Sequence, residues 1–231
     1  MSIVYDNFCT GTRFDYDKVI NLISPGTKDS LLLSTRIQAL KAMNRYPEAI
    51  VDLTSLFVKD TTDTKILIDL AECYKLMGSP RQAADYYRKA VSLRPNNKFF
   101  RLQYIRSLLN AENFKEARDA CHGWLEQDTV SATGYKYLGQ AYEGMQDIPN
   151  AFFSYNVAYR RDSLDAQTVA RIANIFNNNR QFTDAIDVTE CYRLSDTTSV
   201  DVNRQNAKAY CMLKDYKKAI ERYESLKRMG D

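Results

Sequence analysis

Residues 132–165 read ATGYKYLGQAYEGMQDIPNAFFSYNVAYRRDSLD. Large apolar and small residues recur in this stretch at helical intervals, with Leu138 and Tyr142 four residues apart, followed by Ala151, Tyr155 and Ala158. Intervals of three and four place side chains on one stripe of an α-helix. A polar patch, Gln146-Asp147, interrupts the pattern. The stretch therefore predicts two helices joined by a short turn, a helical hairpin.

The same pattern returns along the chain with a fixed period. One alanine of the second helix recurs with every successive difference equal to 34, at Ala49, Ala83, Ala117, Ala151, Ala185 and Ala219. A large apolar residue lies nine residues before each alanine, at Leu40, Tyr74, Leu108, Tyr142, Phe176 and Tyr210. Fixed self-similarity of this kind is the signature of a repeat architecture. The chain is therefore expected to contain six helical hairpins, and no alternating strand pattern competes with them.

Polar patches separate one hairpin from the next. They lie at Asp60-Thr61-Thr62-Asp63, Pro95-Asn96-Asn97, Asp128-Thr129, Asp162-Ser163 and Asp196-Thr197-Thr198. Side-chain oxygens of Asp, Asn, Ser and Thr accept hydrogen bonds from the free N–H groups at the start of a helix. These patches therefore predict where the first helix of each unit begins.

The 34-residue helix-turn-helix unit resembles the tetratricopeptide repeat. The fourth unit has that family's pattern at Tyr135, Leu138, Gly139, Tyr142, Ala151, Tyr155 and Ala158. The second unit has it at Leu67, Leu70, Ala71, Tyr74, Gly78, Ala83, Tyr87, Ala90 and Pro95. The first and sixth units depart from it, since Arg36 and Asn206 stand where leucine is usual. The resemblance implies an all-α fold, a right-handed α-α superhelix of stacked hairpins.

The period also predicts the domain organisation. Residues 1–29 are expected to form a leader with one short capping helix, in which Tyr16, Val19, Ile20 and Ile23 share a face. We expect this helix to cover the apolar edge of the first unit, as terminal repeats require. The six units are expected at residues 30–63, 64–97, 98–131, 132–165, 166–199 and 200–231.

Composition narrows the class of protein and its surroundings. The chain has 231 residues, with 32 basic and 29 acidic side chains, and a net charge of +3 is too small to indicate a nucleic-acid or membrane partner. No apolar run approaches the roughly 18 residues of a membrane span, and the N-terminus has no signal-peptide pattern. Five scattered cysteines favour a reducing compartment. We expect a soluble, cytoplasmic protein, or a periplasmic or exported one if a signal has been removed.

Residues that carry chemistry are few. His122, the one histidine, adjoins Cys121, and adjacent helical residues point about 100° apart, so the pair is not expected to act on one substrate. The closest cysteines, Cys191 and Cys211, lack metal-ligand spacing. Cys73, Cys121, Cys191 and Cys211 are interpreted as small buried core residues. There is no glycine-rich phosphate loop. We therefore expect no enzyme activity, no metal and no cofactor.

The family resemblance implies a binding groove lined by the first helix of each unit, at its second, fifth, ninth and twelfth positions. Cations and amides prevail there or beside it, and the candidate groove residues are Arg106, Lys136, Gln140, Arg171, Asn174, Asn177, Arg204 and Lys208. Donors without matching acceptors suit an extended peptide with acidic side chains or a free C-terminal carboxylate. Family members that bind chaperone C-termini have a carboxylate clamp; Lys136 fits it, but Gln140 replaces asparagine and Arg171 lies in the wrong unit, so the clamp is incomplete.

The interpretation favoured by these residues is a non-catalytic scaffold that binds a protein or peptide in its groove, as part of a larger assembly. An alternative is a structural or regulatory module of a longer polypeptide, whose repeats dock another domain. RNA binding is a distant third, because the charge is low and the period is 34 rather than the 35 residues of helical RNA readers. No nucleic acid and no membrane insertion are expected.

Overall fold

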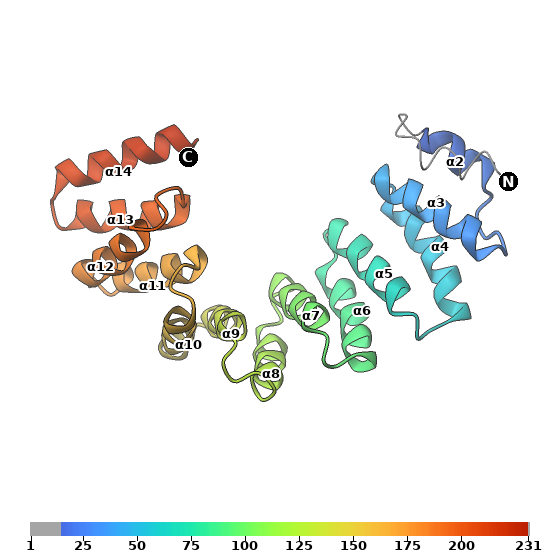
Figure 1. The fold of residues 1–231 in the computed structure, drawn as a ribbon, viewed down its shortest axis with the longest axis horizontal. Coiled ribbons are helices and arrows are strands. Elements are labelled where there is room, and N and C mark those ends of the chain that lie inside the picture. Colours follow the sequence, from blue (N-terminus) through green and yellow to red (C-terminus); the bar gives the residue numbers. More distant parts are fainter. Residues whose placement is uncertain (1–14, 231) are drawn as a thin grey trace. The chain divides into compact units, whose positions relative to one another are not determined.

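The computed structural model describes residues 15–230, and every regular element in that range is an α-helix (Figure 1). The helices of the first part are α2 (Tyr16–Leu22), α3 (Ser30–Ala42), α4 (Tyr46–Lys59), α5 (Thr64–Leu76), α6 (Pro80–Leu93) and α7 (Lys98–Asn110). They are followed by α8 (Phe114–Leu125), α9 (Ala132–Gly144), α10 (Ile148–Arg161), α11 (Ala166–Asn178), α12 (Phe182–Arg193), α13 (Val200–Met212) and α14 (Tyr216–Met229). The predicted all-α class and the helical-hairpin repeat are confirmed.

The helices fall into two compact units, which we call the first half (residues 15–111) and the second half (112–230). The division lies between α7 and α8, inside the predicted third repeat. Within each half, helices that are consecutive in sequence pack on one another, as α5 does on α6 and α6 on α7. Each half is therefore a stack of helical hairpins with mostly local contacts.

The turn inside each hairpin has the same backbone geometry. Its fifteenth repeat position lies in the left-handed region, with φ between 57° and 72°, at Asn44, Gly78, Glu112, Gln146, Arg180 and Lys214. Glycine adopts this conformation without a Cβ penalty, so only Gly78 does so without strain. In the fourth repeat the N–H of Asp147 then donates to the Tyr142 carbonyl at 2.9 Å. This bond satisfies a carbonyl that the end of α9 leaves free.

The start of each first helix is fixed by a side-chain cap. Asp63 accepts from the N–H of Lys65 at 2.8 Å, and Asp165 accepts from the N–H of Thr168 at 2.9 Å. The capping residues of the six first helices are Asp29, Asp63, Asn97, Ser131, Asp165 and Ser199. Three of them, Ser131, Asp165 and Ser199, lie just beyond the predicted polar patches.

The repeated alanine marks the closest packing within each hairpin. All six alanines of the column are at most 3% exposed. In the fourth repeat, a Cβ built on Gly139 of α9 would lie 2.6 Å from two ring carbons of Tyr155 on α10. Small residues therefore let the two helices of a hairpin meet while the aromatic ring fills the space beside them.

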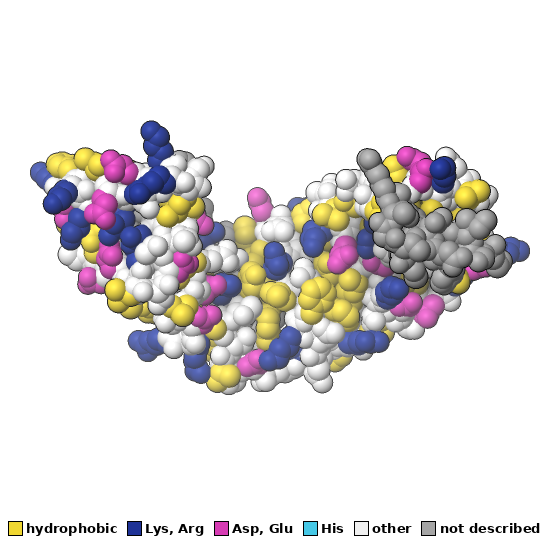
Figure 2. Space-filling model, turned by 45° about the horizontal axis from the view of Figure 1, so that its top comes forward, with side chains coloured by type: hydrophobic (Ala, Val, Ile, Leu, Met, Phe, Trp, Pro, Cys, Tyr) yellow, Lys and Arg dark blue, Asp and Glu magenta, His cyan; other side chains and the backbone are white. Residues whose placement is uncertain are grey.

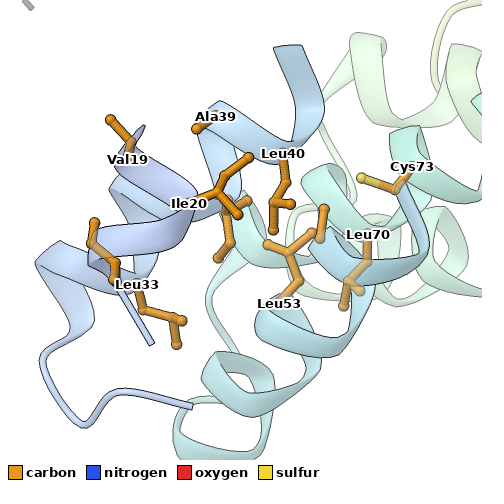
Figure 3. Close-up of a cluster of buried hydrophobic side chains, with 11 residues drawn as sticks. Val19, Ile20, Leu33, Ala39, Leu40, Leu53, Leu70 and Cys73 are labelled. Carbon is orange, nitrogen blue, oxygen red and sulfur yellow. The ribbon is translucent and has the colours of Figure 1, made fainter. Parts of the chain in front are cut away.

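Helix α2 packs on the first hairpin. Val19, Ile20 and Ile23 are each 6% exposed and belong to one buried cluster with Leu33 and Leu40 of α3 (Figure 3). Helix α2 thus covers apolar side chains of the first hairpin. The rest of the predicted leader, residues 1–14 with Cys9, lies outside the described residues.

The two repeats that lack the usual leucine contain buried polar pairs instead. Arg36 forms an ion pair with Asp52 of α4, and their side chains are 5% and 1% exposed. Asn206 donates to the Thr189 hydroxyl at 2.8 Å and accepts from the guanidinium of Arg222 at 3.0 Å. Asp52 and Arg222 occupy the same repeat position, sixteen residues after the polar residue that each contacts. Each departure is thus matched by a partner on the second helix of its own hairpin.

Candidate binding face

The first helix of each repeat presents one side-chain face, which we call the first-helix face of each half. In the first half it belongs to α3, α5 and α7, and in the second half to α9, α11 and α13. It consists of the second, fifth, ninth and twelfth positions of each repeat, together with Arg171 beside them. The predicted groove residues can therefore be located one half at a time.

Lys136 of α9 is held by an ion pair. Its Nζ lies 3.0 Å from Oδ1 of Asp165, which also caps α11, and the Lys136 side chain is 18% exposed. Burial raises the pKa of Asp165, but hydrogen bonds from Thr168 and Lys136 outweigh burial, and the pKa is lowered. The Lys136 charge is therefore balanced within the protein and joins α9 to the start of α11.

Arg171 of α11 is also paired. Its Nη1 lies 2.9 Å from Oε1 of Glu143 on α9, and the hydroxyl of Tyr155 donates to the other oxygen of that carboxylate at 2.7 Å. Burial, followed by the Glu143 charge, raises the pKa of Tyr155 far above its usual range, so the phenol stays protonated as a donor. A ligand carboxylate would have to compete with Glu143 for Arg171.

The predicted amides differ in their surroundings. Asn177 is 4% exposed and donates to the backbone carbonyl of Gln205 at 3.0 Å and to its side-chain oxygen at 3.1 Å. The Nε2 of Gln140 is buried and has no hydrogen-bond partner within the described part of the chain. Asn174 is half-buried on α11. Asn177 therefore joins α11 to α13 and is the least available of the three to a ligand.

Two cations of α13 remain accessible. Arg204 is exposed and pairs with the exposed Asp201 at 2.9 Å. The Nζ of Lys208 lies 3.3 Å from the amide oxygen of Asn178, a neutral partner. Exposed pairs of this kind contribute only about 0–1 kcal/mol, so neither contact holds its side chain firmly.

The first half presents cations without acidic partners. Arg106 of α7 and Lys75 of α5 are exposed, and neither has an ion-pair partner among residues 15–230. Phe99, at the second position of α7, is 49% exposed. A hollow of about 260 Å³ in the same half is lined by Ser34 and Gln38 of α3 and by several charged residues. Lys75 is absent from the predicted site, although it occupies the twelfth position of its repeat.

The residues with reactive side chains are dispersed. Cys121 is buried and burial raises its pKa to about 12, whereas His122 is exposed, so the two face apart as predicted. Burial likewise raises the pKa of Cys73 to about 11. The prediction that all four cysteines are buried is wrong for Cys191 and Cys211, which are exposed. Cys211 occupies the twelfth position of the sixth repeat, which belongs to the first-helix face and not to the buried side of α13.

No group of three or more His, Cys, Asp or Glu side chains among residues 15–230 could hold a metal ion. No helix described there combines the length and the apolar character that a membrane span requires.

Comparison with known proteins identifies the repeat. A family model of the tetratricopeptide repeat matches residues 64–97, which are the predicted second repeat. Residues 64–97 match the tetratricopeptide repeat, and the fold of the described residues is that of a solenoid of such repeats. The fold of the chain is similar to that of PilF from Pseudomonas aeruginosa, with a TM-score of 0.64 and 16% identity over 93% of this chain and 91% of that one. It is also similar to YrrB, described as a TPR protein with an unusual peptide-binding site, with a TM-score of 0.53 and 16% identity over 77% of this chain and 91% of YrrB.

One curated relative matches part of the chain. It is the DnaJ homolog subfamily C member 7 homolog of Dictyostelium discoideum, 34% identical over 137 residues. The match covers 59% of this chain and 23% of the relative, so the chain spans about a quarter of the length of that protein.

Proposed function

We propose that this tetratricopeptide array is a protein-binding scaffold that takes an extended acidic peptide on its first-helix faces. The observation that carries the proposal is the pair of exposed cations, Arg106 and Lys75, that lack acidic partners in the first half. Exposed Phe99 supplies apolar contact area on the same helix as Arg106. The likeness in fold to YrrB, described as a TPR protein with an unusual peptide-binding site, supports the same class of ligand.

The contacts of the second half favour recognition of acidic side chains over recognition of a terminal carboxylate. Lys136 and Arg171 are paired with Asp165 and Glu143, so a ready-made clamp for a terminal carboxylate is absent from that half. The accessible donors that remain there are Arg204 and Lys208. The proposed ligand is therefore recognised by its acidic side chains first and by its terminus second.

The test uses an array of acidic, neutral and basic twelve-residue peptides, each with a free or an amidated C-terminus. We expect the full chain to select acidic peptides. We expect Arg106→Glu combined with Lys75→Glu to lower the affinity for the tightest-binding peptide at least tenfold, because a hydrogen bond to a charged group contributes about 1.5–3 kcal/mol. The measurement is fluorescence anisotropy of the labelled peptide.

The matched control is Arg81→Glu combined with Lys115→Glu. Both residues are exposed on second helices and, like the test pair, lack acidic partners among residues 15–230, so the change in net charge is the same. Binding should stay within about twofold of the unmodified chain. Equal loss in both double variants would mean that net charge alone attracts the peptide and would overturn the proposed site.

A second candidate is a module of a longer polypeptide that docks another of its domains. It is favoured by the Dictyostelium relative, in which the matching stretch is 23% of the length. If the chain is such a module, none of the free test peptides should bind above background. A neighbouring domain of the same polypeptide should bind when it is supplied on a separate chain.

A further inference from the structure

The hollow in the first half lies where the first repeat meets the second. It has a volume of about 260 Å³ and is lined by residues of α3, α4 and the start of α5. Its apolar wall consists of Ile37, Leu53, Leu56 and Ile66, and the carboxylates of Asp60 and Asp63 line it as well. Figure 2 shows apolar side chains at the surface of the first half beside acidic and basic ones. The hollow therefore combines an apolar wall with carboxylates.

The second half has a smaller hollow at the same place in the repeat. Its volume is about 120 Å³, and it lies where the fourth repeat meets the fifth. Six of its seven lining residues stand at repeat positions that also line the larger hollow. Among them are the fifth position, which is Lys136 or Ser34, and the thirty-fourth, which is Asp165 or Asp63. The two hollows are therefore two versions of one site.

The smaller hollow already contains a cation. Lys136 and Asp165 both line it, and the Nζ of Lys136 lies 3.0 Å from Oδ1 of Asp165. The other carboxylate oxygen, Oδ2, accepts from the N–H of Thr168 at 2.9 Å. In the second half the site is thus filled by an ammonium group on an unbranched aliphatic stem, and the chain itself supplies it.

The first repeat has the carboxylate without that cation. Ser34 stands at the fifth position, and its hydroxyl donates to the Leu31 carbonyl at 2.8 Å. Asp63 is half-buried, and its Oδ1 accepts from the N–H of Lys65 at 2.8 Å. Asp63 has no ion-pair partner among residues 15–230. The larger hollow therefore presents a carboxylate oxygen where the smaller one holds a lysine.

The other charged side chains at the larger hollow do not replace the missing lysine. Asp69 is paired with Lys41 at 2.5 Å, and Lys59 donates to a backbone carbonyl at 3.3 Å. Lys65 is exposed and forms no ion pair within the described part of the chain. Asp63 therefore remains available to a cation from outside the chain.

We propose that the hollow of the first half binds a lysine side chain of the bound peptide. The aliphatic stem packs on the apolar wall, as the stems of long basic side chains commonly do, and the ammonium group pairs with Oδ2 of Asp63. Because Oδ1 already accepts a backbone N–H, one oxygen is left, which suits the point charge of lysine better than the forked guanidinium of arginine. This inference rests on the proposed function and adds one basic residue to the acidic ligand.

The cation of α5 fixes the expected spacing in the peptide. Lys75 stands twelve residues after Asp63, which corresponds to about 18 Å along an α-helix. An extended peptide covers that length in about five residues. The peptide is therefore expected to carry a lysine about five residues from an acidic residue.

The probe is a labelled twelve-residue peptide of glycine and serine, with lysine as its third residue and glutamate as its eighth and ninth. A second version has Nε-acetyl-lysine at the third residue, which removes the charge, and a third version has arginine there. Binding to the full chain is measured by fluorescence anisotropy. We expect the lysine peptide to bind about tenfold more tightly than the acetylated one, because the hydrogen bond that is lost involves charged groups. It should also bind more tightly than the arginine peptide.

Asp63→Asn should lower the affinity for the lysine peptide to that for the acetylated peptide. Asparagine caps a helix as well as aspartate does, so the start of α5 is kept. Asp29→Asn serves as the comparison, because Asp29 caps α3 by accepting from the N–H of Leu31 at 2.9 Å and does not line the hollow. This variant should keep the tenfold difference between the two peptides. Arg106→Glu combined with Lys75→Glu should weaken all three peptides alike.

A second measurement needs no peptide. Ser34→Lys gives the first repeat the lysine that the fourth repeat has, and Ser34→Met adds an unbranched stem without a charge. We expect the urea midpoint of Ser34→Lys to be higher than that of Ser34→Met, and Asp63→Asn should remove this difference. Ser34→Lys should also remove the preference for the lysine peptide, since its own ammonium group then occupies Asp63.

Several outcomes would overturn the proposal. They are equal affinity for the lysine and acetylated peptides, a preference for lysine that survives Asp63→Asn, and equal urea midpoints for Ser34→Lys and Ser34→Met. Tighter binding of the arginine peptide would contradict the expected recognition of lysine. Free Nα-acetyl-lysine amide that bound as tightly as the peptide would assign the hollow to a small amine instead. If no peptide bound although Ser34→Lys had the higher midpoint, the proposed function would fail while the ammonium site would stand.

Discussion

Replacing Asp52 by alanine is expected to lower the free energy of unfolding by about 3–5 kcal/mol, because it leaves a buried charge without its partner. Asp52 is the ion-pair partner of Arg36, whose side chain is 5% exposed. The Nε of Arg36 already lacks a hydrogen-bond partner among the described residues. The half-buried Glu48 has its nearest oxygen 3.9 Å from the guanidinium and is already held by Arg45 at 2.7 Å, so it is a poor substitute for Asp52. The effect is measured as a shift of the urea unfolding curve.

The control for this prediction removes both charges. Burial raises the pKa of Asp52 and the charge of Arg36 opposes that rise, so the attraction within the ion pair does not fully offset the cost of burying the carboxylate. A raised carboxyl pKa means that ionisation of Asp52 above its unfolded pKa destabilises the fold. Arg36→Leu combined with Asp52→Ala, which restores the usual leucine, is therefore expected to be far more stable than Asp52→Ala alone. A double variant as unstable as the single one would contradict this account of the pair.

Replacing Gly139 by leucine is expected to lower the free energy of unfolding by about 3 kcal/mol, the upper end of the usual effect of overpacking. The first added carbon would lie 2.6 Å from ring carbons of Tyr155, and Tyr155 is fully buried. The ring is also held by its hydrogen bond to Glu143, which opposes its movement away from the added side chain. Urea unfolding followed by circular dichroism measures the change.

The control variant Gly123→Leu is expected to change the free energy of unfolding in the opposite direction. Gly123 lies within α8, and a Cβ built there meets nothing within 4 Å. Glycine in a helix is less stable than an ordinary helix former by somewhat under about 1 kcal/mol, so this variant should be slightly more stable than the unmodified chain. If Gly139→Leu and Gly123→Leu shifted the curve in the same direction, close packing at Gly139 would not be the cause.

The helical hairpins could be predicted from the sequence because their period is carried by core side chains. Small residues such as Ala151 and Gly139 are required where two helices meet, and the same requirement recurs in every repeat. The backbone of the turns was less predictable. Of its six left-handed residues only Gly78 is a glycine, whereas Glu112 and Arg180 adopt that conformation against their own preference because the packed helices impose it.

The buried polar pairs left a signal that sequence reasoning could have used. Arg36 and Asn206 were recognised as departures from the usual leucine, and Asp52 and Arg222 each lie sixteen residues further along. Two polar residues at the same pair of core positions indicate mutual contact, since an isolated buried charge is strongly unfavourable. Comparing the repeats column by column would have revealed both pairs.

The state of the candidate groove residues could not be predicted in this way. Lys136 contacts Asp165, and Arg171 contacts Glu143, because neighbouring first helices bring them together across 28 or 29 residues. Long side chains such as these can adopt several rotamers, and the repeat pattern fixes their positions but not their partners. Arg106 and Lys75 differ from them only because no neighbouring side chain among the described residues gives them an acidic partner.

Site-specific photo-crosslinking tests most directly whether the first-helix face binds the peptide. Benzoylphenylalanine replaces Phe99 of α7 in one variant and Phe153 of α10 in another; these side chains are 49% and 65% exposed, on a first and a second helix respectively. The account predicts that the labelled acidic peptide crosslinks to position 99 and not to position 153, and that Arg106→Glu removes the product. Crosslinking at position 153 with none at position 99 would contradict it.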